Sequence, residues 1–275
     1  MNTYNENRNT SPVLGIKDKY LNQLHSDFEL LSEIVLTQMI KAEELVNDNH
    51  NKEIVDILKR NEKIINSLDV TIREKVINAI MLFTPRASDL RRLMAYHDMT
   101  ISMERVGDLI ENITLALQDM DFTITGFESY KRLLSKMFNQ TNKMLRKAVF
   151  AFSGVSHEMA YDTILMDDKV DKLERKIERK LAEDFNNQAL STQSLVNMMN
   201  LNSLSYFLER IGDKAVDIAE SAVYLIEGKD IRHDKSVKHS KKVESLEKKE
   251  KADKDSLEEN SNIRDKEGKT NSDDQ

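Results

Sequence analysis

The chain of 275 residues contains few residues that break helices and none that form cross-links. It has no cysteine, only two prolines and seven glycines. The lack of cysteine excludes disulfides, iron–sulfur clusters, thiolate zinc sites and cysteine nucleophiles. Aromatic residues make up 6% of the chain and charged residues 32%. Together with abundant Leu, Ile, Met, Glu and Lys, this composition predicts a mostly helical protein.

The chain also lacks long apolar runs. No stretch approaches the roughly 20 apolar residues of a membrane span. Residues 1–11 are polar and rich in asparagine, so no secretory signal is predicted and a cytoplasmic protein is expected. The net charge of −7 argues against nucleic acid as a partner. No Gly-rich phosphate loop and no catalytic triad is recognisable.

Apolar residues recur every three to four positions through most of the chain, which predicts six amphipathic helices. They are expected at about 21–42, 54–76, 87–120, 127–153, 156–186 and 192–227. Polar residues at 48–51, with Asn or Asp as the cap of the second helix, and the pair Thr84–Pro85 are expected to separate the first three. Thr125–Gly126 opens the second set, and Gly228 is expected to end the last helix.

Both ends of the chain differ in composition from the helical part. Residues 1–16 are expected to form a disordered extension. Residues 234–275 mix Lys, Glu, Asp, Ser and Asn with very few apolar residues. Such a segment cannot bury enough apolar surface to offset its ordering entropy, so a disordered charged tail is expected.

One short string occurs twice. ERVGD at Glu104–Asp108 recurs as ERIGD at Glu209–Asp213, at an offset of 209 − 104 = 105 residues. Each copy places two carboxylates four residues apart, on one face of a helix. Each also places a glycine inside that helix, at a cost of about 1 kcal/mol relative to alanine. Close approach of a neighbouring helix or a ligand is expected to outweigh this cost.

A second acidic cluster follows the same offset. Its members Asp167, Asp171 and Glu174 map onto Glu62, Asn66 and Asp69. Two motifs at one constant offset predict a duplicated three-helix unit, with repeats at 17–122 and 123–233.

In an antiparallel bundle, the acidic faces of the second and third helices of each repeat are expected to meet. The candidate ligands are Asp167, Asp171, Glu174, Glu209, Asp213 and Asp217 in the second half, and Glu62, Asp69, Glu104, Asp108 and Glu111 in the first. Converging carboxylates without a compensating base must protonate or hold a cation. Oxygen ligands suit Mg²⁺, Ca²⁺, Mn²⁺ or iron, and also permit zinc. The alternative is a solvated acidic face. With Asn66 in place of an acid, weaker binding is expected in the first half.

Other polar residues have simpler interpretations. Arg105 and Arg210 are expected to form ion pairs with neighbouring carboxylates, with an anion contact as the alternative. His97 and His157 are interpreted as ordinary surface or helix-end histidines. Neither belongs to the Glu-x-x-His pattern of di-iron bundle enzymes. The 13 methionines are interpreted mainly as core residues, and a Met-rich partner surface is the alternative.

These motifs resemble the PhoU family. The strings at Glu104–Asp108 and Glu209–Asp213 match its repeated E-R-I-G-D signature. PRASDLR at 85–91 is similar to the family's entry to the third helix, and DDKVDKLE at 167–174 to its D-D-x-V-D-x-L-E segment. Residues 224–233 resemble its C-terminal ending. The resemblance covers roughly residues 17–233.

The resemblance implies six helices in two three-helix bundles, with iron or zinc clusters on the acidic motifs. It implies a non-enzymatic, cytoplasmic regulator that forms homo-oligomers such as a homodimer. Such a regulator couples a phosphate transporter to a membrane sensor histidine kinase and holds off the starvation response. The transporter is an ABC system with its ATPase, or a sodium–phosphate cotransporter. Contact with the membrane is expected only through these partners.

Two departures from the family pattern concern the first half. Asn66 replaces the usual acid, and Ser102 stands where an acid often precedes the signature string.

Two other functions remain as alternatives, a carboxylate-bridged metalloenzyme and a metal-free helical scaffold. The leading prediction is a metal-binding, all-α regulator of phosphate transport and signalling.

Overall fold

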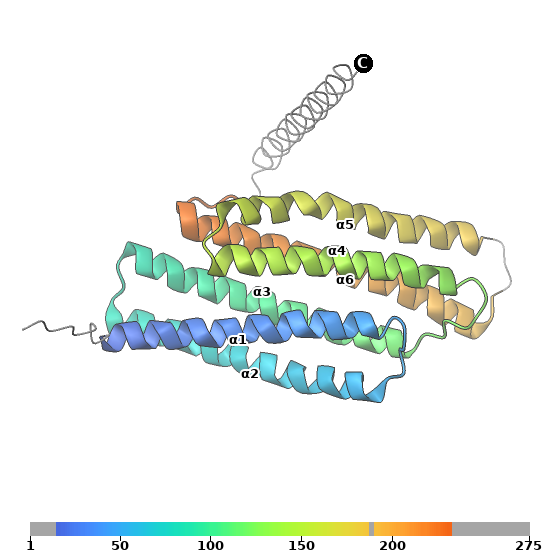
Figure 1. Cartoon of the computed structure of the whole chain (residues 1–275), viewed down its shortest axis with the longest axis horizontal. Coiled ribbons are helices and arrows are strands. Elements are labelled where there is room, and N and C mark those ends of the chain that lie inside the picture. Colours follow the sequence, from blue (N-terminus) through green and yellow to red (C-terminus); the bar gives the residue numbers. More distant parts are fainter. Residues whose placement is uncertain (1–14, 187–189, 233–275) are drawn as a thin grey trace, which may run out of the picture. The chain divides into compact units, whose positions relative to one another are not determined.

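The chain folds into helices whose ends follow the breaks in the sequence. The computed structural model describes residues 15–186 and 190–232. Its helices are α1 (Ile16–Glu44), α2 (Lys52–Phe83), α3 (Ala87–Gln118), α4 (Glu128–Ser153), α5 (His157–Asp184) and α6 (Thr192–Glu227) (Figure 1). The described residues contain no strand, and the predicted all-α class is confirmed.

Side-chain caps begin three of the helices. The Asn51 side chain accepts a hydrogen bond from the backbone N–H of Ile54 at 3.2 Å, as its position predicts. Ser156 and Ser191 cap α5 and α6 in the same way. These caps satisfy N–H groups that have no partner within the helix.

Gly228 ends α6, as predicted, in the left-handed conformation with φ at 72°. A Cβ atom there would lie 2.7 Å from the guanidinium of Arg91. Both the backbone conformation and the available space therefore require glycine. The Arg91 guanidinium also lies 5.9 Å from the ring centroid of Tyr224. The two flanking motifs thus meet where the start of α3 passes the end of α6.

Each half of the bundle contains three helices, and the halves pack through α3 against α6 and α1 against α4 (Figure 1). The apolar stripes of the helices face inward. Phe28, Tyr96 and Phe152, from α1, α3 and α4, are buried with their ring centroids 5.2–5.3 Å apart. This aromatic cluster joins the two repeats at the shared core.

The described residues up to Asp230 belong to one compact unit, and Ile231 and Arg232 belong to a second. The predicted tail and nearly all of the predicted N-terminal extension lie outside the described residues. Within the described part of the chain, none of the helices combines the length and apolar character that a bilayer crossing needs.

Candidate functional site: two carboxylate clusters

Helices α2 and α3 bring the first set of acidic residues together. Glu62 and Asp69 are buried on α2, while Glu104 and Asp108 are half-buried on the facing side of α3. Glu111 lies one turn beyond Asp108 and is exposed. All five predicted first-half residues lie within electrostatic reach of an acid on the other helix.

Glu62 is the most perturbed acid of the first cluster. Burial, followed by the charges of Asp108 and Glu111, raises its pKa from 4.5 to about 7. A side-chain hydrogen bond from Asn66 acts in the opposite direction. Asn66 therefore helps to hold the Glu62 carboxylate in addition to replacing an acid.

The second cluster repeats this arrangement between α5 and α6. Burial raises the pKa of Glu209 to about 7, with Asp213 and Glu174 as the next causes. The pKa of Asp213 is raised by burial and then by Asp167. Asp171 also acts on Glu209 from α5. Asp167, Asp171 and Glu174 of α5 thus face Glu209 and Asp213 of α6, while Asp217 acts on Asp213 from the same helix.

The expectation that no base compensates these acids was wrong. Basic side chains from the same helices lie against six of them, and Arg105 lies 3.7 Å from Glu104 as well as against Asp108. The ion pairs are Arg73–Asp69 (3.3 Å), Arg105–Asp108 (3.4 Å), Arg175–Asp171 (3.4 Å), Arg210–Asp213 (3.0 Å) and Lys214–Asp217 (2.6 Å). In these five pairs the base lies three or four residues from the acid, where helix geometry brings side chains together. The predicted pairing of Arg105 and Arg210 is confirmed.

The glycines of the two strings have different surroundings. A Cβ on Gly107 would lie 3.1 Å from Glu62 Oε2 and 3.2 Å from Ile65 Cγ2, tighter than ordinary contact. A Cβ on Gly212 would lie 3.5 Å from Val170 Cγ1, an ordinary contact distance. Close helix approach therefore accounts for Gly107, as predicted, and not for Gly212.

The two histidines are part of the local structure. His157 begins α5 and contacts the Glu227 carboxylate near the end of α6, as a helix-end residue would. His97 Nδ1 lies 3.5 Å from Asp98 Oδ1, and the ring lies within electrostatic reach of Asp69.

The donor chemistry of both clusters fits a hard cation, since only oxygen ligands face one another. Glu62 Oε2 is also buried without a hydrogen-bond partner, which is costly for a carboxylate oxygen. No three Asp, Glu or His side chains among the described residues stand close enough to enclose an ion as they are placed. An ion at either cluster therefore requires side-chain rotation or additional ligands.

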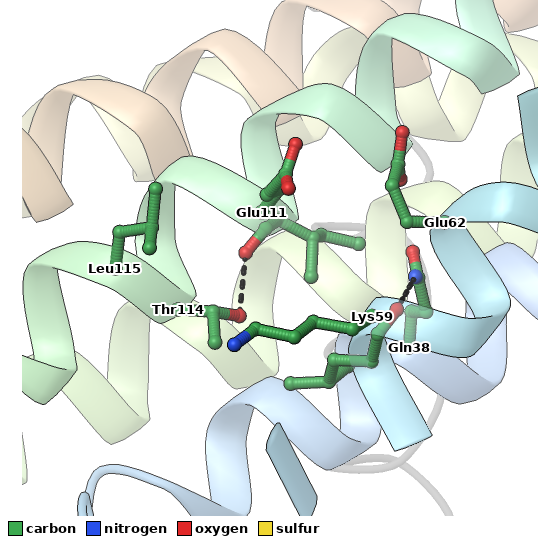
Figure 2. A pocket seen from close by; sticks show the side chains of 8 residues that line it. Gln38, Lys59, Glu62, Glu111, Thr114 and Leu115 are labelled. Carbon is green, nitrogen blue, oxygen red and sulfur yellow. Dashed lines mark hydrogen bonds between the residues drawn. The ribbon is translucent and has the colours of Figure 1, made fainter. Parts of the chain in front are cut away.

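A small pocket lies beside Glu62 (Figure 2). Its volume is about 20 Å³, room for about one water molecule. It is lined by Gln38, Leu58, Lys59, Glu62, Ile110, Glu111, Thr114 and Leu115. Gln38 was missed in the sequence, although its position on the apolar face of α1, three residues after buried Val35, marks it as a polar residue in the core.

Comparison with known proteins supports the duplicated architecture. A family model described as "PhoU domain" matches residues 28–116 and again residues 134–222. A relative from Clostridium acetobutylicum, named as a phosphate-specific transport system accessory protein PhoU homolog, is 25% identical over 215 residues. The match covers 77% of this chain and 94% of the relative.

Two crystal structures share the fold. PhoU from Pseudomonas aeruginosa superposes with a TM-score of 0.69 at 23% identity, covering 77% of this chain and 99% of the other. The phosphate transport system regulatory protein PhoU from Streptococcus pneumoniae gives the same score and identity, covering 78% and 98%. The two matched segments coincide with the two halves of the bundle, and each contains one acidic cluster.

Proposed function

Because the chain belongs to the PhoU family, we propose that it is an accessory and regulatory protein of a phosphate transport system, without catalytic activity of its own. The observation that carries this proposal is the double match of the PhoU domain, in register with the two acidic clusters. The names of the relatives from Clostridium and Streptococcus support the same role.

In this role the bundle is an adaptor at the cytoplasmic side of the membrane. It contacts a phosphate transporter, either the ATPase of an ABC system or a sodium–phosphate cotransporter. It also contacts a sensor histidine kinase and holds the starvation response off when phosphate is plentiful. The aromatic cluster and the Arg91–Tyr224 contact support this role, since they join the halves into one unit that can bind partners as a whole.

The acidic clusters are the proposed metal sites. Glu62, Glu104 and Asp108 would hold a cation between α2 and α3, and Glu174, Glu209 and Asp213 would hold one between α5 and α6. A bound cation supplies positive charge that relieves the repulsion between facing carboxylates. The raised pKa values of Glu62 and Glu209 support this proposal, because both groups lie where negative charge is costly.

Deletion of the encoding gene tests the regulatory role. We expect phosphate-responsive genes to be expressed in phosphate-rich medium and phosphate uptake to change. The intact gene should restore both. A deletion strain whose uptake and phosphate-responsive expression both match the parent would contradict the proposal.

The metal sites require a separate test. Elemental analysis of protein purified without chelator, compared with a Glu209→Gln/Asp213→Asn variant, measures the metal held by the second half. Wild-type protein that binds no iron, zinc or manganese would favour the metal-free scaffold. Turnover of a phosphate ester by the metal-loaded protein, abolished in Asp213→Ala, would favour the metalloenzyme.

A further inference from the structure

The pocket beside Glu62 contains two buried oxygen atoms without partners. Gln38 is 1% exposed and Glu62 is 7% exposed. Gln38 Oε1 and Glu62 Oε2 both lack a hydrogen-bond partner, and both residues line the same pocket between α1, α2 and α3. Most buried polar atoms in folded proteins have a partner, so two unpaired atoms at one pocket call for a specific explanation.

The orientation of the Gln38 amide is fixed by its other atom. Its Nε2 donates a hydrogen bond to the backbone carbonyl of Leu58 on α2 at 3.1 Å (Figure 2). Oε1 is consequently the amide atom without a partner. An amide oxygen and an ionised carboxylate oxygen can only accept hydrogen bonds. These two atoms therefore need a donor or a cation between or beside them.

Neither donor side chain at the pocket pairs with these two oxygens. Lys59 makes no hydrogen bond to them, and Figure 2 shows its ammonium directed toward Thr114 and away from Glu62. The Thr114 hydroxyl, also at the pocket, donates to the carbonyl of Ile110 at 2.8 Å. Figure 2 shows the Glu62 and Glu111 carboxylates, from α2 and α3, directed toward the same side. The pocket has room for about one small ion or one water molecule. Carboxylate and amide oxygens are ligands that hard cations prefer.

We propose that Gln38 of α1 supplies an amide-oxygen ligand to a cation held by Glu62, so that the first-half site draws on three helices instead of two. This inference rests on the metal binding put forward under the proposed function. Gln38 compensates in part for Asn66, which stands where the second half has Asp171. The buried positions of α4 follow those of α1 at an offset of 106, so the equivalent of Gln38 in the second half is position 38 + 106 = 144, a buried methionine. The amide ligand is thus specific to the first half.

Manganese titration followed by electron paramagnetic resonance tests this proposal. The full-length chain carries Glu209→Gln and Asp213→Asn as a parent background, so that the remaining bound Mn²⁺ belongs to the first half. Gln38→Met keeps the side-chain length and removes the acceptor. We expect it to weaken Mn²⁺ binding by at least about tenfold, because loss of a group that only supports a ligand already has an effect of about this size. Gln38→Glu should strengthen binding.

Met144→Leu, at the equivalent buried position of α4, is the matched control and should leave Mn²⁺ binding unchanged. Circular dichroism establishes that each variant is folded. If Gln38→Met does not fold, the Mn²⁺ affinity of Gln38→Glu tests the proposal instead. Equal Mn²⁺ affinity in the parent and in both Gln38 variants would overturn the proposal and indicate a buried water at the pocket. A parent that binds no Mn²⁺, while the wild type binds it, would overturn it as well. If the wild type itself binds none, the metal sites fail while the regulatory role remains testable by gene deletion.

Discussion

The two repeats place a glycine at the same position against different neighbours. In the first half, Gly107 faces Glu62 and Ile65 at distances that leave no room for a methyl group. In the second half, a Cβ on Gly212 would lie at an ordinary contact distance from Val170. The side chains on α2 are longer than their equivalents on α5. Packing thus demands glycine in one repeat and only permits it in the other.

The acidic clusters differ in a complementary way. The first half has fewer acids, but Glu62 and Asp69 are buried. The second half has more acids, all of them half-buried. Burial is the largest cause of the raised pKa values in both clusters, and both Glu62 and Glu209 reach about 7. The same sequence motif therefore lies in two sites that differ in the exposure and in the number of their acids.

The largest expected effect concerns the two glycines. Gly107→Ala should destabilise the protein, because the added methyl forces Ile65 and Glu62 to move. Gly212→Ala should stabilise it slightly, because alanine favours the helix. Their free energies of unfolding, measured with urea, should differ by about 2–3 kcal/mol. Equal stabilities would show that α2 shifts away from α3 at little cost.

The pH dependence of stability should reveal a property that both halves share, a glutamate with a raised pKa. Because the pKa of Glu62 is raised from 4.5 to about 7, the folded state binds this proton more tightly than the unfolded state. The contribution of Glu62 protonation to the stability of the folded state is present below about pH 4.5 and is lost as pH rises toward 7. In metal-free protein at pH 8, Glu62→Gln should therefore be more stable than wild type by about 1–2 kcal/mol.

Glu209→Gln should act in the same direction, since the pKa of Glu209 is also raised to about 7. Urea unfolding with chelator at pH 5 and pH 8 measures both variants. At pH 5 their advantage should largely disappear. An advantage of equal size at both pH values would show that the carboxylate charge is not its cause.

Metal content should rank the two sites. With more acids, the second half is predicted to bind metal more tightly, so Asp171→Asn should release more metal than Asp69→Asn on dialysis against a chelator. The expected difference in affinity is about tenfold, or about 1.4 kcal/mol. Elemental analysis of both variants measures it. Greater loss of metal from the Asp69 variant would reverse the ranking. It would show that burial of the acids affects metal affinity more than their number does.

The smallest expected effect concerns the connection between α4 and α5. Val155 adopts φ of 52°, a left-handed conformation that is unfavourable for a β-branched residue. Val155→Gly should relieve this strain and raise the free energy of unfolding by about 0.5–1 kcal/mol. Asn49→Gly, in the connection between α1 and α2 of the first half, should show no such gain. The Asn49 side-chain amide donates hydrogen bonds to the carbonyls of Leu117 and Met120 near the end of α3, and glycine would lose them. A loss of stability in Val155→Gly would show that the exposed valine makes favourable contacts.

Much of the fold could be predicted because its determinants are local. Asn51 and Gly228 mark helix ends through their own backbone and capping chemistry, and both predictions are confirmed. Apolar spacing predicted the six helices. The ion pairs of Arg105 and Arg210 also follow from spacing along one helix. The compensating bases Arg73, Arg175 and Lys214 lie at the same spacing and were overlooked.

The sequence by itself determined the duplication, the helices and the residues that can face one another, because these depend on period and offset. Only the tertiary structure decided how closely α2 approaches α3 and where Gln38 points. It also decided that Arg91 would meet Tyr224 across the repeats. These features depend on the distance and rotation between helices, which arise from the packing of many side chains at once.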